Sequence, residues 1–187
     1  MLLEFISNIF IKGAKMRYHN ITKDDMLNGE GLRVVLWVAG CTHHCKNCHN
    51  PITWDIAGGI EFDEAAENEI YAELEKDHID GITFSGGDPL HPLNRDDVNK
   101  LIQKIHSKYP NKTIWLYTGY TYEEIKDFEG LPYIDVLVDG EFVEELKDEK
   151  LYWIGSSNQR IIDVKNTLKT GEIVIYEDNS QAKLSSV

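Results

Sequence analysis

The residues with the clearest capacity for chemistry are three cysteines, Cys41, Cys45 and Cys48. They are the only cysteines of the chain, and they lie in one short loop with the spacing CxxxCxxC. Clustered thiolates are soft ligands that suit zinc or an iron–sulfur cluster. A 4Fe-4S cluster takes one cysteine at each of its four irons. Three cysteines would therefore leave one iron without a protein thiolate and open to another ligand.

The same loop also fits a zinc site. His43, His44 and His49 lie among the cysteines or directly beside them, and three cysteines with one histidine form a closed tetrahedral zinc site. In that case the metal only holds the loop in shape. The protein would then be a zinc-stabilised binding module whose acidic surface docks a partner. The loop by itself leaves both alternatives open.

A second motif, Gly86-Gly87-Asp88-Pro89, directly follows an apolar stretch. Two glycines allow a polar group of a ligand to come close to the backbone. Their carbonyl oxygens and the Asp88 carboxylate are acceptors, so they suit a cationic ammonium group better than a phosphate. Taken alone, the motif is better explained as a tight turn.

The segments that must position these motifs alternate between strands and helices. Apolar, β-branched runs predict strands at residues 33–39, 81–85, 113–118 and 134–139. Apolar residues at helical spacing predict helices at 63–78 and 94–109, with Asn94 as N-cap of the second, and Thr121 with Glu124 predicts a capping box of a short third helix. In the tail, residues 152–154, 160–164 and 172–176 are candidates for short strands.

This alternation predicts an α/β fold with a parallel sheet. Both motifs follow the C-terminal end of a predicted strand, which is where a (β/α) barrel carries its functional loops. A full eight-unit barrel typically needs about 250 residues, and this chain has 187. We therefore expect an open partial barrel in a single domain.

Composition excludes some classes of function. The net charge is −13 and the 19 basic residues are scattered, so a nucleic-acid partner is not expected. An odd number of cysteines in one loop is a poor disulfide framework and favours the reducing cytoplasm. Residues 1–15 are partly apolar but interrupted by Glu4 and lack a preceding basic region. They predict neither a signal peptide nor a membrane span.

We accordingly divide the chain into three parts. Residues 1–15 are expected to be an N-terminal extension, or translation upstream of a start at Met16. Residues 16–165 are expected to form the functional domain. Residues 166–187 are expected to be a C-terminal tail, to which no role is assigned.

The cysteine motif followed by Gly86-Gly87-Asp88-Pro89 resembles the radical S-adenosylmethionine superfamily. Within it, the chain resembles the activating proteins of anaerobic (class III) ribonucleoside-triphosphate reductases. The matching segments, in order, are 30–33, 40–50, 53–54, 85–92, 117–120, 138–142 and 155–160. The resemblance extends from about Met16 to Arg160. Asn47 stands where these activating proteins usually have glycine, and His49 where they usually have an aromatic residue.

The resemblance implies a site and a fold. Cys41, Cys45 and Cys48 would bind a 4Fe-4S cluster, and the amino and carboxylate groups of S-adenosylmethionine would chelate the open iron. Gly86, Gly87 and Asp88 would hold the amino group of this cofactor. Asp139 would lie near it, although an aspartate at a strand end is as often a helix cap. The implied fold is the open partial (β/α) barrel of the radical S-adenosylmethionine type.

The resemblance also implies an activity. A low-potential donor such as flavodoxin would reduce the cluster, and S-adenosylmethionine would be cleaved to methionine and a 5′-deoxyadenosyl radical. That radical would take hydrogen from a glycine of the large subunit of the anaerobic reductase. A different glycyl-radical enzyme as the protein substrate is an alternative. Neither a nucleic acid nor a membrane is expected as a partner.

Overall fold

A computed structural model of the chain describes residues 15–177. Its centre is one mixed sheet of seven strands in the order β3-β1-β2-β4-β5-β6-β7, with β3 and β7 at its two open edges. The strands are β1 Arg17–Asp25, β2 Arg33–Val38, β3 Ile60–Glu61, β4 Gly81–Gly86, β5 Thr113–Tyr117, β6 Val136–Asp139 and β7 Arg160–Asp163. The extension expected at residues 1–15 lies, apart from Lys15, outside the described residues, as does the tail beyond residue 177.

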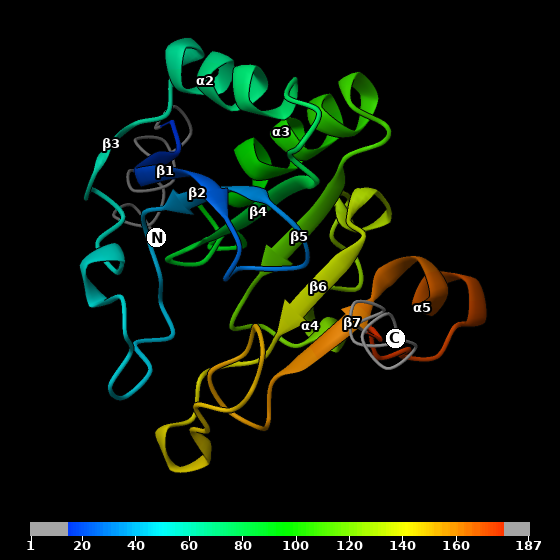
Figure 1. The fold of residues 1–187 in the computed structure, drawn as a ribbon. Helices are drawn as coiled ribbons and strands as arrows, with labels where there is room; N and C mark the ends of the chain where they lie inside the picture. The colour runs from blue at the N-terminus through cyan, green and yellow to red at the C-terminus, as the bar shows by residue number, and fades with distance from the viewer. Residues whose placement is uncertain (1–14, 178–187) are drawn as a thin grey trace, which may run out of the picture.

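Helices cover one face of this sheet (Figure 1). The α-helices are α2 Glu64–Leu74, α3 Arg95–Lys108, α4 Tyr122–Ile125 and α5 Val164–Thr170, and single 3-10 turns lie at Pro51–Thr53, Leu131–Tyr133 and Glu144–Leu146. The apolar stripe of α3 packs with α2 onto the main core, which includes Phe84 of β4 and Leu116 of β5. Within residues 15–177, no helix is long and apolar enough to cross a membrane.

The four central strands β2, β4, β5 and β6 are parallel, as predicted. Their C-terminal ends are in register, since Val38 pairs with Gly86 and Tyr117 with Val138. The loops that follow these strands therefore begin at one end of the sheet. Figure 1 shows the cysteine loop after β2 and the segment after β6 at this same, lower end.

The prediction of a parallel sheet does not hold outside these four strands. Strands β1, β3 and β7 are antiparallel to their neighbours. Strand β1 was not predicted because its sequence is mostly polar. It has two apolar side chains, Tyr18 and Ile21, and both are buried. Residues 160–164 do supply β7, whereas 152–154 form no strand and 172–176 contribute only the single bridge of Ile175 with Ile162.

Two helix predictions also need adjustment. The helix predicted at 63–78 ends at Leu74. Helix α5 was not predicted, and the division expected between residues 165 and 166 falls inside it. By contrast, the predicted capping box is present at the start of α4, where the Glu124 carboxylate accepts hydrogen bonds from the Thr121 backbone N–H and hydroxyl.

The opposite face of the sheet carries a smaller aromatic cluster. Trp115, Val136 and Val138 are buried there against Tyr117 of β5, Ile161 of β7 and three residues from outside the strands, Trp153, Ile154 and Tyr176. The rings of Trp115, Trp153 and Tyr176 meet edge to face. The segment that follows β6 thus covers part of the face that α2 and α3 leave open.

Arg33 at the start of β2 is buried beneath this cluster. Its guanidinium group lies 5.4 Å from the centre of the Trp115 ring. It donates hydrogen bonds to the Thr83 hydroxyl at 2.8 Å, to the Thr113 carbonyl at 2.9 Å and to the Ile82 carbonyl at 2.8 Å. Burial lowers the pKa of Arg33 to about 10, so the side chain is still charged at neutral pH. One cation thereby joins the starts of β2, β4 and β5.

We predict that Arg33→Met destabilises the protein by about 3 kcal/mol, because it leaves several buried acceptors without their charged donor. The matched control is Arg17→Met. Within residues 15–177 the Arg17 side chain donates only to the Gly58 and Gly59 carbonyls near the surface, and its loss should cost less than about 1 kcal/mol. Urea unfolding of the metal-free protein under anaerobic conditions measures both. Equal losses in the two variants would contradict the role given to Arg33.

Candidate metal and cofactor site

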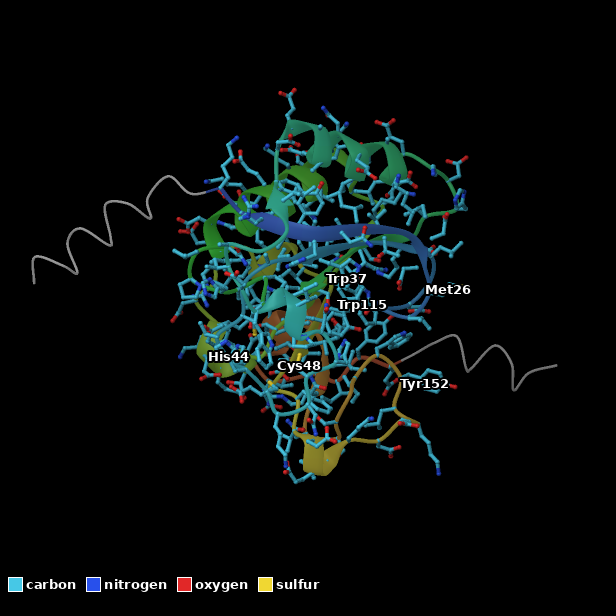
Figure 2. The ribbon with its side chains drawn as sticks, turned by 90° about the vertical axis from the view of Figure 1, so that its left-hand side faces the viewer. Met26, Trp37, His44, Cys48, Trp115 and Tyr152 are labelled. Atoms are coloured by element: carbon cyan, nitrogen blue, oxygen red, sulfur yellow. The ribbon has the colours of Figure 1, made fainter. Side chains whose placement is uncertain are left out.

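The three cysteines line one pocket at the C-terminal ends of the parallel strands, with a cavity volume of about 130 Å³. Residues that follow all four of these strands contribute to its wall. An adjoining hollow of about 420 Å³ shares Gly119, Gly140 and Glu141 with it. Cys48 and His44 mark this end of the molecule in Figure 2, with Trp37 and Trp115 of the sheet above them in the view.

Each cysteine sulfur has at least one backbone N–H group beside it. The Asn50 N–H donates to Cys48 Sγ at 3.4 Å. Burial raises the pKa of Cys41 and of Cys45, and backbone hydrogen bonds oppose this rise, from His43 at Cys41 and from Phe142 at Cys45. Such N–H groups stabilise metal-bound thiolates and tune an iron–sulfur cluster. The donor set therefore fits a soft metal centre.

The histidines of the loop have other contacts. His43 binds Asp88 through Nε2 at 2.7 Å and Glu141 through Nδ1 at 2.8 Å, so both of its nitrogens are engaged. The ring of His44 packs against Trp54, and His49 lines the pocket. Over the described part of the chain, no three His, Cys, Asp or Glu side chains surround a single point as ligands of one ion would. Cysteines of a four-iron cluster bind different irons and need not meet at one point.

The cysteine loop is fixed at its base by backbone hydrogen bonds. The Gly40 N–H donates to the Thr53 carbonyl at 2.7 Å and the Cys41 N–H to the Trp54 carbonyl at 3.0 Å. Farther along the loop, Asn47 has a φ of +57°. Glycine adopts this left-handed conformation freely, and asparagine tolerates it better than most residues. Asparagine in place of the usual glycine therefore keeps the shape of the loop.

The two glycines after β4 are required by this loop. A Cβ on Gly87 would lie 2.4 Å from the Gly40 carbonyl oxygen and 2.8 Å from that of Thr53. Gly86 has a φ of +108°, and a Cβ there would lie 2.6 Å from the Val38 nitrogen. The expected reason for these glycines was the approach of a ligand. The structure supplies another reason, which is that the base of the cysteine loop packs directly against them.

Asp88 is only 1% exposed, and its carboxylate is occupied by donors of the protein. Besides His43, it accepts hydrogen bonds from the Thr118 hydroxyl at 2.9 Å, the Gly119 N–H at 3.0 Å and the Leu90 N–H at 2.7 Å. The hydrogen bond to Asp88, aided by that to Glu141, raises the pKa of His43 to about 9. The ammonium group that Asp88 was expected to receive would therefore have to compete with these donors for the carboxylate.

Asp139 is likewise engaged within the protein. It is 1% exposed, accepts a hydrogen bond from the Tyr122 N–H at the start of α4, and pairs with the Arg160 guanidinium group. Arg160 also bonds to Glu123 on α4. The sequence left two roles open for Asp139, a position near the cofactor and a helix cap. In the structure its carboxylate caps α4 and pairs with Arg160. It lines the adjoining hollow rather than the cysteine pocket.

Two side chains that bear on the site were missed or misassigned. Asn94 does not cap α3 with its side chain, which instead donates to the Ala39 carbonyl at 2.8 Å and the Asp88 carbonyl at 3.2 Å. Gln159 accepts from the Gly155 N–H and donates to the Gly140 carbonyl at 3.0 Å. Segment 155–160 thus holds the loop after β6. In the sequence it was marked only by its match to the activating proteins and by its two neighbouring side-chain amides, Asn158 and Gln159.

Comparison with known proteins agrees with the chemistry of this pocket. A family described as a 4Fe-4S single cluster domain matches residues 27–162. Three similar proteins are each named anaerobic ribonucleoside-triphosphate reductase-activating protein. That of bacteriophage T4 is 44% identical and covers 78% of this chain and 93% of its own length. Those of Vibrio cholerae and Escherichia coli K12 are both 45% identical, over 78% and 77% of this chain and 97% and 96% of their own lengths.

We predict that Cys41→Ala, Cys45→Ala and Cys48→Ala each abolish a stable cluster of about four irons, because each removes the only thiolate of one iron. His44→Ala and His49→Ala are the controls and should leave the iron content unchanged. Iron and sulfide analysis after anaerobic reconstitution provides the measurement. Loss of the cluster in either histidine variant would overturn this ligand assignment.

We further predict that Gly87→Ala impairs cluster binding, because the added Cβ displaces the backbone at the base of the cysteine loop. Iron content should fall by at least about half, with a loss of stability of roughly 1–3 kcal/mol. Gly171→Ala is the control, since Gly171 has a φ of +76° but no atom within 4 Å of a Cβ. It should cost about 1–2 kcal/mol and bind iron normally. A fully loaded Gly87→Ala protein would refute the steric explanation.

Proposed function

The chain belongs to the 4Fe-4S single cluster domain family and, within it, to the anaerobic ribonucleoside-triphosphate reductase-activating proteins, and we propose that it is the enzyme that generates a glycyl radical on such a reductase. The observation that carries this proposal is the pocket lined by all three cysteines of the chain. Cys41, Cys45 and Cys48 would hold three irons of the cluster and leave the fourth open.

The open iron is the proposed position of S-adenosylmethionine. Gly87 supports this, because the residue lines the pocket and its carbonyl accepts no hydrogen bond from the described residues. It is therefore available to the amino group of the cofactor. Asp88 would contribute mainly by holding the surrounding loops in place through its bonds to His43, Thr118 and Gly119. The adjoining hollow, with Asp139 and Arg160 in its wall, offers room for the rest of the cofactor.

Once bound, the cluster and S-adenosylmethionine would supply the redox chemistry, which is a one-electron reductive cleavage of the cofactor coupled to removal of a hydrogen atom from a glycine of the partner. The protein supplies ligation and orientation and excludes water. The backbone N–H groups at the cysteine sulfurs would adjust the reduction potential of the cluster.

The open edges of the sheet suit a protein substrate. A closed barrel mouth would obstruct a peptide loop of a large subunit, whereas this sheet ends at β3 and β7 without joining. We propose the partial (β/α) barrel of the radical S-adenosylmethionine type as the relevant fold and the reductase large subunit as the partner. A low-potential donor such as flavodoxin would provide the electron in the cytoplasm. Neither a nucleic acid nor a membrane forms part of the proposal.

The test uses the reconstituted, reduced protein with S-adenosylmethionine under anaerobic conditions. Methionine and 5′-deoxyadenosine should appear by chromatography, and a glycyl radical signal should appear by electron paramagnetic resonance when the large subunit is added. A large subunit with its target glycine replaced by alanine is the matched control and should give no such signal.

Other outcomes would reject defined parts of the proposal. Cleavage of S-adenosylmethionine without a protein radical would reject this partner and favour another glycyl-radical enzyme. No cleavage by a fully loaded, fully reduced cluster would reject the radical reaction. A colourless protein with one tightly bound zinc would support the binding module instead.

A further inference from the structure

The segment that follows β6 is tied to the cysteine loop by two pairs of side chains. Glu141 Oε1 lies 2.8 Å from Nδ1 of His43, and Glu145 accepts a hydrogen bond from the Lys46 ammonium group at 2.9 Å. The pairs advance together along both stretches, from 43 to 46 and from 141 to 145. The two stretches therefore run side by side at the same end of the sheet (Figure 1).

Between these two pairs, Phe142 lies beside Cys45. Both residues line the pocket of the three cysteines. The Phe142 N–H donates to the Cys45 sulfur, and this hydrogen bond opposes the rise that burial causes in the pKa of the thiol. A donor at a cysteine sulfur stabilises the more negative, reduced form of an iron–sulfur cluster and so raises its reduction potential. The direction of this one N–H therefore bears on electron transfer.

That direction is fixed at the far side of the same peptide group. A trans peptide group is planar, so its C=O and its N–H point in opposite directions. The N–H of Phe142 shares its peptide group with the carbonyl of Glu141, and this carbonyl accepts a hydrogen bond from the side-chain amide of Asn158 at 2.8 Å. Asn158 thus sets the tilt of the peptide plane. A hydrogen bond at the carbonyl also polarises the N–H on the other side.

Asn158 lies in a turn that is itself held in place. Gln159 Oε1 accepts a hydrogen bond from the Ser156 N–H at 3.2 Å, and the Gln159 N–H donates to the Ser156 carbonyl at 3.1 Å. The same two side chains bond to the segment after β6, Gln159 at the Gly140 carbonyl and Ser156 at the Val143 N–H. The Asn158 amide is therefore preorganised, whereas a water molecule at the same carbonyl would not be held in one place.

Resting on the iron–sulfur part of the proposed function, we propose that Asn158 is a positioning residue for the cluster. It holds the peptide group between Glu141 and Phe142 so that the N–H points at the Cys45 thiolate, and it thereby raises the reduction potential of the cluster. Asn158 acts from outside, because it lines the adjoining hollow and not the cysteine pocket. Segment 155–160 then takes part in electron transfer as well as holding a loop.

The test compares Asn158→Ala with Asn99→Ala in the full chain after anaerobic reconstitution. Asn99 is the matched control, since its amide lies near the surface on α3, donates to Glu129 at 3.2 Å and lines neither hollow. Both variants should load about four irons, because neither loses a cysteine. Their melting temperatures should stay within about 4 °C of the wild type, because both changes lie near the surface.

The reduction potential is the decisive measurement. In a redox titration followed by electron paramagnetic resonance, Asn158→Ala should lower the ratio of reduced to oxidised cluster at a given potential about fivefold, equivalent to about 40 mV for one electron. The shift is toward lower potential, because the reduced form loses a donor. Electron–nuclear double resonance in D₂O should show a weaker coupling of one exchangeable site. Asn99→Ala should match the wild type in both measurements.

Four results would overturn the inference and leave the proposed function intact. They are an unchanged potential in Asn158→Ala, an equal shift in both variants, a shift without a change in the exchangeable coupling, and loss of the cluster in Asn158→Ala. The last would make Asn158 necessary for binding iron rather than for setting its potential. A wild-type protein that binds no four-iron cluster would reject the proposed function and this inference together.

Discussion

The buried carboxylate of Asp88 is the interaction on which the site depends. It follows β4, and its donors come from the loops after β2 and β5, namely His43, Thr118 and Gly119. His43 extends the connection to Glu141 after β6. A carboxylate in the interior is tolerated only when it is fully hydrogen-bonded. The loops after all four parallel strands are therefore fixed relative to one another by the same requirement.

Close backbone packing imposes a second constraint at the same place. The base of the cysteine loop lies directly on Gly87, and the end of β2 lies directly on Gly86. The position of the cysteines is thus set by contacts that leave no room for a side chain. Together with the Asp88 bonds, this gives a preformed loop whose sulfurs face backbone N–H groups. A site of this kind needs little rearrangement to accept a cluster.

The two faces of the sheet differ in the residues that they bury. The face under α2 and α3 is apolar and supplies the main core. The other face combines an aromatic cluster, the buried cation of Arg33 and the hydroxyl of Tyr117. At the start of the strands on that face, Arg33 satisfies buried acceptors of Thr83, Ile82 and Thr113.

The sequence by itself determined the central strands, the helices α2 and α3, the clustering of the three cysteines in one loop and the family of the chain. These depend on local patterns: apolar runs, helical spacing and the CxxxCxxC motif. Only the tertiary structure decided that Asp88 and Asp139 turn inward, that Asn94 and Gln159 hold loops, and that β1 and β7 run antiparallel to their neighbours. The bond from Gly119 to Asp88 spans 31 residues and that from Asn94 to Ala39 spans 55. Residue type tells that a polar side chain needs a partner, but the choice of a distant partner depends on packing that no local pattern encodes.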